Sequence, residues 1–163
     1  MNLLTERRSF LDKIDEKILN ELQKDSTINL EALAMKLNST KSTIHYRIKR
    51  LEEENIIEGY HAKVDSFKLS DDFQAVILIR AKYGPDYSEK IGEMLKNIPG
   101  VWAVYNVLGD IDFVVLMRAK NRKQFINRME IIEGSNLVER TNTTVIAHII
   151  KEDQKYILDN EIE

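Results

Sequence analysis

Apolar and polar residues alternate along this chain with two different periods. From residue 12 to residue 55 the apolar positions recur every three or four residues, which is the spacing of helices with one buried face. Three short helices are predicted there, with Asp12, Asn29 and Thr40 as their N-caps. Because only a tight turn separates the last two helices, the segment is predicted to form a helix-turn-helix unit. Two short β-rich runs around Gly59 then predict a small hairpin or wing.

Beyond a polar link at residues 66–72 the period changes to that of a sheet. Strands are predicted over residues 75–82, 101–108, 113–119 and 137–151. Helices are predicted after Asp86 and Asn121, and Gly134 ends the second. The order βαββαβ indicates a ferredoxin-like domain.

We therefore expect an α+β protein with two domains. The predicted boundaries are a winged helix-turn-helix domain over 1–59, a wing strand and linker over 60–73, a ferredoxin-like effector and oligomerisation domain over 74–152, and a tail over 153–163.

The predicted strands are apolar on both faces. Val76 and Leu78 point opposite to Ile77 and Ile79, and the strand over 113–119 repeats this pattern. Two helices cover only one face of such a sheet, and an antiparallel sheet that meets water is polar on its outer face. The second face is therefore predicted to be covered by the same sheet of another subunit, in a homodimer.

Composition narrows the classes of function. The chain has 163 residues, 43% of them hydrophobic, and it contains no apolar run of the ~20 residues that a membrane span needs. Its N-terminus lacks the apolar run of a signal peptide, so a cytoplasmic protein without a membrane partner is expected. With no cysteine and three scattered histidines, neither a zinc finger nor another metal site is expected, and no cofactor is indicated.

Positive charge gathers in one place although the formal net charge is −3. The stretch from Ser39 to Arg50 holds four cations and no acid, on a predicted helix whose apolar side is formed by Ile44, Ile48 and Leu51. Such a helix suits a groove of double-stranded DNA. The candidate DNA-binding residues are Thr40, Lys41, Ser42, Thr43, His45, Tyr46, Arg47, Lys49 and Arg50.

These candidates divide by chemistry. Ser42, Thr43 and Tyr46 are candidates for bases or sugars, and His45 suits either bases or phosphates. The four cations, Lys41, Arg47, Lys49 and Arg50, are candidates for phosphates. Two alternatives stay open: Arg47 and Arg50 could instead pair with Glu53 or Glu54, and the whole helix could be an ordinary solvated one. The second is disfavoured because solvated helices usually mix charges of both signs.

Several segments together resemble the Lrp/AsnC (leucine-responsive and asparagine-responsive, feast/famine) family of regulators. LDKIDEKILNELQKD is similar to the family's first helix, LAMKLNSTKSTIHYRIKRLEEENIIEGYHAKVD to its helix-turn-helix and wing, and VLGDIDFVVLMRA to its effector-domain hairpin. The resemblance spans residues 11–152. It implies a transcription factor that dimerises, assembles further into tetramers or octamers, and responds to a small amino acid.

The resemblance also implies an effector site. In this family the hairpin and the last strand line a pocket where dimers meet, and the matching positions here are Gly109, Asp110, Asp112, Thr141 and Thr143. The amides of a glycine turn suit an α-carboxylate, and a carboxylate suits an α-ammonium group. Without the resemblance, the Gly-Asp pair would indicate only a turn.

Three functions compete. An effector-responsive transcriptional regulator is the leading interpretation, and an effector-independent architectural DNA-binding protein is the alternative. An enzyme is disfavoured because no nucleophile is paired with a base and no catalytic residue is identified. Trp102, Tyr105 and His148 are interpreted as packing residues, while Arg7, Arg8 and the acidic tail are left open.

Overall fold

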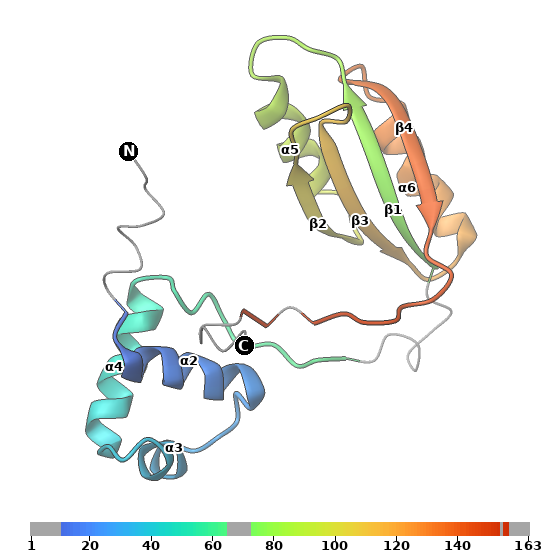
Figure 1. Cartoon of the computed structure of the whole chain (residues 1–163). Coiled ribbons are helices and arrows are strands. Elements are labelled where there is room, and N and C mark those ends of the chain that lie inside the picture. The colour runs from blue at the N-terminus through green and yellow to red at the C-terminus, as the bar shows by residue number, and fades with distance from the viewer. Residues whose placement is uncertain (1–10, 65–72, 154, 157–163) are drawn as a thin grey trace. The chain divides into compact units, whose positions relative to one another are not determined.

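The computed structural model of the chain describes residues 11–64, 73–153, 155 and 156 (Figure 1). The chain divides into two compact units, one of residues 1–63 and 152–163 and the other of residues 64–151. Arg7, Arg8, the polar link over 66–72 and the end of the tail lie outside the described residues.

The first helix of the first unit is α2 (Lys13–Lys24). Asp12 caps it as predicted, since its carboxylate accepts hydrogen bonds from the amides of Ile14 at 2.8 Å and Asp15 at 2.9 Å. The Asp15 carboxylate in turn accepts from the Asp12 amide at 3.1 Å, which completes a capping box. The helix therefore starts at a position that its own sequence determines.

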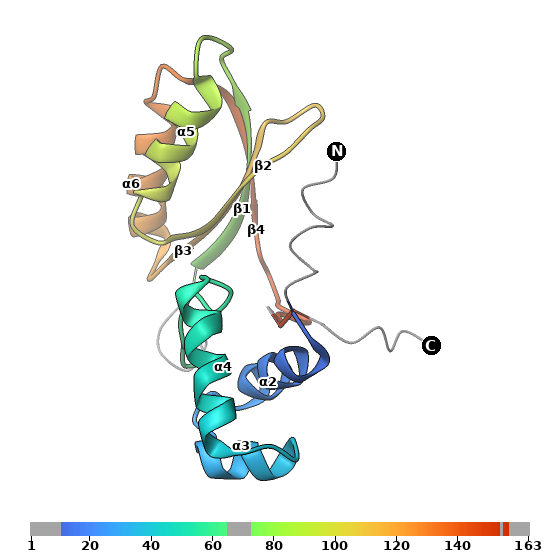
Figure 2. The same cartoon turned by 90° about the vertical axis from the view of Figure 1, so that its left-hand side faces the viewer.

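Helices α3 (Leu30–Lys36) and α4 (Lys41–Glu53) complete the helix-turn-helix (Figure 2). Their predicted caps are confirmed: Asn29 accepts from the Ala32 amide at 2.7 Å, and Thr40 accepts from the Thr43 amide at 3.2 Å. The buried apolar residues of this unit are Ile18, Leu33, Ala34, Ile44 and Leu51. The predicted apolar face of α4 is thus the one that packs inward.

The predicted hairpin after α4 is not formed by the described residues 56–64, which contain no strand. The amides of Ile56 and Ile57 donate to the Leu51 carbonyl at 2.9 and 3.1 Å. They therefore hydrogen-bond to the end of α4 and not to a neighbouring strand. The Tyr60 hydroxyl donates to the Glu52 carboxylate at 2.8 Å. Burial and this hydrogen bond raise the pKa of Tyr60 to about 12.

The second unit is a four-stranded antiparallel sheet with two helices. Its elements in chain order are β1 (Phe73–Ala81), α5 (Tyr87–Lys96), β2 (Val101–Asn106), β3 (Phe113–Ala119), α6 (Arg122–Glu133) and β4 (Val138–Val145). The strands lie in the order β2-β3-β1-β4, so the predicted ferredoxin-like arrangement is confirmed. Asn121 caps α6 as predicted, by accepting from the Gln124 amide at 2.9 Å.

Strand β4 is shorter than the predicted run of 137–151. Val145 pairs with Ala75, and the Ile146 amide donates to the Gln74 carbonyl at 2.8 Å. Because β1 begins at Phe73, almost no partner strand remains for the residues that follow. The β-rich composition of residues 146–151 therefore does not extend the sheet.

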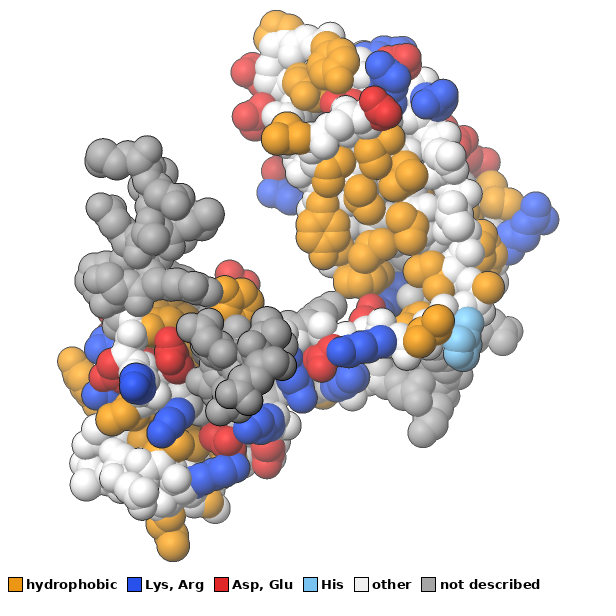
Figure 3. Space-filling model, viewed as in Figure 1, with side chains coloured by type: hydrophobic (Ala, Val, Ile, Leu, Met, Phe, Trp, Pro, Cys, Tyr) orange, Lys and Arg blue, Asp and Glu red, His pale blue; other side chains and the backbone are white. Residues whose placement is uncertain are grey.

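Helices α5 and α6 cover one face of the sheet and leave the other open (Figure 2). The covered face is fully buried at Ile77, Ile79, Val115 and Met117. On the open face apolar side chains gather in a broad patch (Figure 3). The patch consists of Val76, Leu78, Trp102, Ala103, Tyr105, Val114 and Leu116. Trp102 is stacked on the Arg118 guanidinium, whose carbon lies 4.7 Å from the ring centroid.

Candidate nucleic-acid interface

Helix α4 presents a polar, exposed surface along one side. Its exposed residues include Lys41, Ser42, Thr43, His45 and Lys49, and Tyr46 is 66% exposed. At its start the Thr40 hydroxyl lies 2.8 Å from the Thr43 hydroxyl and 3.0 Å from that of Ser42. No acid occupies the first turn, so this helix end keeps the positive potential that favours phosphate.

Arg47 and Arg50 do not share that surface. Arg47 donates to the Asp12 carboxylate at 2.7 Å and to the Asp15 carboxylate at 2.8 Å. Arg50 donates to the second Asp15 oxygen at 2.6 Å, and its Nε lies 3.9 Å from Glu54. Asp15 is completely buried. The structure therefore places both arginines in a network that ties α4 to α2, and their predicted phosphate contacts stay predictions.

The electrostatics of this network follow from its hydrogen bonds. The pKa of Asp12 is lowered, chiefly by the hydrogen bond from the Asp15 amide and also by Arg47. The pKa of Arg47 is raised, first by its hydrogen bond to Asp15 and then by that to Asp12. Each group thus favours its charged form. Sequence reasoning missed Asp15 as a partner, although its place in the capping motif was readable from its spacing to Asp12.

The two lysines of α4 have looser partners. Lys41 donates to Glu31 in the first turn of α3, and this hydrogen bond lowers the pKa of Glu31. Lys49 lies 3.6 Å from Glu53, one turn further along α4. All four side chains are more than half exposed, so water competes for each pair.

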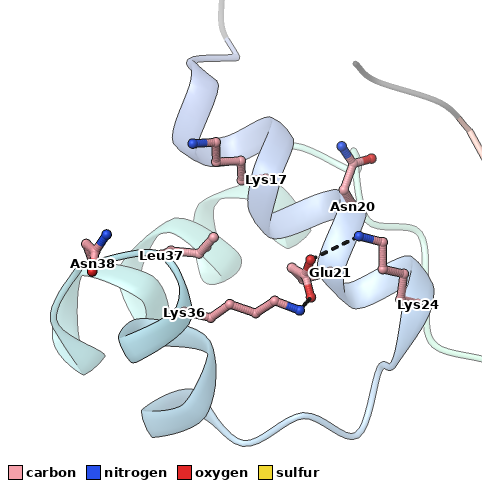
Figure 4. A pocket seen from close by; sticks show the side chains of 7 residues that line it. All are labelled: Lys17, Asn20, Glu21, Lys24, Lys36, Leu37 and Asn38. Atoms are coloured by element: carbon pink, nitrogen blue, oxygen red, sulfur yellow. Dashed lines mark hydrogen bonds and ion pairs between the residues drawn. The ribbon is translucent and has the colours of Figure 1, made fainter. Parts of the chain in front are cut away.

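Within the first unit, Tyr156 of the C-terminal segment contacts α2. The Gln23 side chain donates to the Tyr156 carbonyl at 2.9 Å, and the Tyr156 amide donates back to the Gln23 carboxamide at 2.6 Å. A shallow cleft lies elsewhere on this unit, between α2 and α3 (Figure 4). At its centre Glu21 pairs with Lys36 and, at 3.1 Å, with Lys24.

Three of the predicted effector residues belong to the β2–β3 hairpin, where two are exposed and one is buried. Gly109 and Asp110 are exposed at its tip, and Gly109 has a φ of 151°, which L side chains rarely adopt. Asp112 is buried, and its carboxylate accepts from the Ala81 amide at 2.8 Å and from the Tyr83 hydroxyl at 3.1 Å. Asp112 therefore fastens the hairpin to the end of β1.

Thr141 and Thr143 lie on the helix-covered face of the sheet, since they pair with Ile79 and Ile77. The Thr141 hydroxyl donates to Glu133 of α6 at 3.1 Å. The Thr143 hydroxyl oxygen is buried without a hydrogen-bond partner among the described residues. Within one chain, these threonines and the hairpin tip are thus not brought together into one cleft. A second cleft, between α5 and β2, includes none of the five predicted residues in its lining.

The described residues were also compared with the requirements of a metal site and of a membrane span. Among them, no group of three or more His, Asp or Glu side chains could hold a metal ion. None of the described helices has the length and apolar content that a membrane span requires.

The network predicts a large loss of stability from Asp15→Ala. That substitution leaves two partly buried arginines without their main acceptor, so the free energy of unfolding should fall by about 2–4 kcal/mol. Urea unfolding followed by circular dichroism measures it, and the fluorescence of the single tryptophan, Trp102, reports the second unit separately. In Glu54→Ala, which removes only the exposed partner of Arg50, the loss should stay below about 1 kcal/mol. Equal losses in the two variants would contradict the role of Asp15.

Comparison with known proteins covers almost the whole chain. A model of the winged helix-turn-helix DNA-binding family matches residues 11–58, and a model of the Lrp/AsnC ligand binding domain matches residues 74–156. The HTH-type transcriptional regulator FL11 of Pyrococcus furiosus is 37% identical over 145 residues, which cover 89% of this chain and 95% of the relative. The FL11 regulator of Pyrococcus horikoshii is 35% identical over 142 residues, covering 87% and 93%.

Solved structures agree with this. The feast or famine regulatory protein of M. tuberculosis, complexed with L-methionine, is 26% identical with a TM-score of 0.81, covering 90% of this chain and 99% of that one. An AsnC family regulator of Agrobacterium tumefaciens, 22% identical, has the same fold with a TM-score of 0.81, covering 90% and 96%. The similar proteins are transcriptional regulators and not enzymes. The chain belongs to the Lrp/AsnC family of DNA-binding, helix-turn-helix transcriptional regulators.

Proposed function

We propose that α4 is the recognition helix of this regulator and that a small amino acid controls its assembly and DNA binding. The observation that carries the proposal is the exposed basic side of α4, free of acids from residue 39 to residue 50, in a helix-turn-helix whose other helices are capped and packed. Such a helix fits the major groove of double-stranded DNA.

The exposed side of α4 has distinct roles along its length. Ser42, Thr43 and Tyr46 contact bases or sugars, while Lys41 and Lys49 contact phosphates. His45 is exposed between these groups and suits either partner. Thr40 caps the helix, and its position directs the amides of the first turn towards the DNA backbone. Arg47 and Arg50 hold the helix in place through Asp15.

The effector part of the proposal rests on the ligand-binding domain and the exposed hairpin tip. Gly109 offers backbone amides for an α-carboxylate, and Asp110 offers a carboxylate for an α-ammonium group. Asp112 positions this tip through Ala81. Thr141 and Thr143 lie on the covered face, so their part is to support β4 and α6. Because one chain holds only part of such a site, another subunit completes it.

The open face of the sheet supports a homodimer as the basic unit of assembly. Apolar residues of β1, β2 and β3 gather there in a patch (Figure 3). A sheet face of this composition is unfavourable in water. A second copy of the same sheet supplies a matching apolar surface. Tetramers or octamers then arise from contacts between dimers.

The dimer proposal predicts that a charge at the centre of the patch separates the subunits. Leu116→Asp should give particles with the 19.0 kDa mass of one chain in light scattering, while the unchanged protein has at least twice that mass. Ile131→Asp, on the 52% exposed outer side of α6, is the matched control and should keep the assembly. A monomeric unchanged protein at micromolar concentration would refute the dimer.

The effector proposal predicts a selective response to amino acids. In a thermal-shift screen of the proteinogenic amino acids, one or two should stabilise the protein, by about 2.7 kcal/mol at ~100 times the Kd. The same compounds should change the mass of the assembly in solution, because an effector needs different affinities for two states. Asp110→Asn should weaken this response, while Asp153→Asn in the C-terminal segment should not.

The alternative is an architectural protein of the same fold without an effector. It predicts DNA binding that no amino acid changes, together with an unchanged assembly. A screen without any stabilising compound would therefore support this alternative and remove the effector part of the proposal, while leaving the role of α4 intact.

A further inference from the structure

Each cation of α4 has an acid from its own unit as a partner. Arg47 and Arg50 share the buried Asp15, while Lys41 pairs with Glu31 and Lys49 pairs with Glu53. The positive charge that distinguishes this helix in the sequence is thus compensated in the folded, unbound unit. A DNA phosphate must therefore displace an acid wherever it binds one of these cations.

Burial separates the pairs of the two arginines with Asp15 from those of the two lysines. The Asp15 side chain is 1% exposed, and those of Arg47 and Arg50 are 19% and 32% exposed, so exchanging this partner would leave a carboxylate uncompensated in the interior. In contrast, the side chains of Lys41 and Glu31 are 58% and 60% exposed, and those of Lys49 and Glu53 are both 65% exposed. These two exposed pairs therefore open at little cost.

We propose that Glu31 and Glu53 are built-in competitors of DNA phosphate, which hold Lys41 and Lys49 in the unbound protein and lower its affinity for DNA of any sequence. This inference rests on the proposed role of α4 in DNA binding. Phosphate contacts carry no sequence information. Weakening them lowers occupancy of random DNA, so that selection of a site relies more on contacts such as those of Ser42, Thr43 and Tyr46.

The positions of the two acids fit this role. Glu31 lies in the first turn of α3 and reaches across the helix-turn-helix to the first residue of α4. Glu53 lies at the other end of α4, one turn beyond Lys49. The hydrogen bond from Lys41 lowers the pKa of Glu31, as expected for a carboxylate that accepts from a cation.

The test measures binding of the full chain to a mixed-sequence DNA duplex of about 40 base pairs. Glu31→Gln and Glu53→Gln keep the size of each side chain and remove its charge. Each should tighten binding by about two- to fivefold at low salt, which corresponds to the strength of an exposed ion pair. The gain should shrink as salt rises, because salt weakens the competing pair.

A double-substitution cycle distinguishes competition from simple repulsion of DNA. In a Lys41→Ala background, Glu31→Gln should no longer tighten binding, while Glu53→Gln should still do so. Glu139→Gln is the control for net charge, since Glu139 lies in the second unit and forms an exposed pair with Arg80 at 3.9 Å. It should change the affinity by less than about 1.5-fold.

Three results would overturn the inference. The first is unchanged affinity in both Glu31→Gln and Glu53→Gln, with melting curves confirming that both variants fold. The second is a gain from Glu31→Gln that persists without Lys41, and the third is an equal gain from Glu139→Gln. A protein that fails to bind the duplex even at low salt contradicts the proposed role of α4 instead, so the two failures are distinguishable.

Discussion

The structure of the DNA-binding unit depends on one buried carboxylate. Asp15 is buried, and a charge in that position is tolerated only with compensating partners. Its partners are Arg47 and Arg50 of α4 together with the backbone amide of Asp12. The same carboxylate therefore completes the N-terminal cap of α2 and sets the position of α4. It also holds two of the four cations of α4 away from the surface that we propose for DNA contact.

A different constraint governs the second unit. A four-stranded sheet with two helices has one face left over, and here that face carries Val76, Leu78, Val114 and Leu116. The helix-covered face forms a core that is buried within one chain. The apolar open face has no such cover among the described residues of one chain, which is why we propose that a second subunit covers it. The proposed effector site between subunits agrees with the finding that one chain does not bring the five predicted residues together.

Local sequence was sufficient to predict much of the fold. The caps at Asp12, Asn29, Thr40 and Asn121 follow from side chains that bond to amides two or three residues away, and all four are confirmed. The ferredoxin-like arrangement was predicted from the element order βαββαβ and is also confirmed. Strand length was harder to predict, because the end of β4 is set by where β1 runs out and not by the composition of residues 146–151.

The roles of the site residues were less predictable, for a physical reason. A cation on a helix has the same appearance in a sequence whether it faces DNA or a buried acid, and Asp15 lies 32 residues from Arg47 and 35 from Arg50. Likewise, the face occupied by Thr141 and Thr143 depends on their register with Ile79 and Ile77. Such tertiary pairings decide the role of a residue whose type alone allows several.

We propose that the lysines of α4 contact DNA phosphate and that its arginines hold the helix in place. The most direct test is the salt dependence of DNA binding in Lys49→Ala and Arg50→Ala. Lys49→Ala should weaken binding to all sequences, reduce the slope of log affinity against log salt by roughly one, and leave stability unchanged. Arg50→Ala should lower the free energy of unfolding while the slope stays that of the unchanged protein. A slope that falls equally in both variants would contradict the account, because Arg50 would then be a phosphate contact like Lys49.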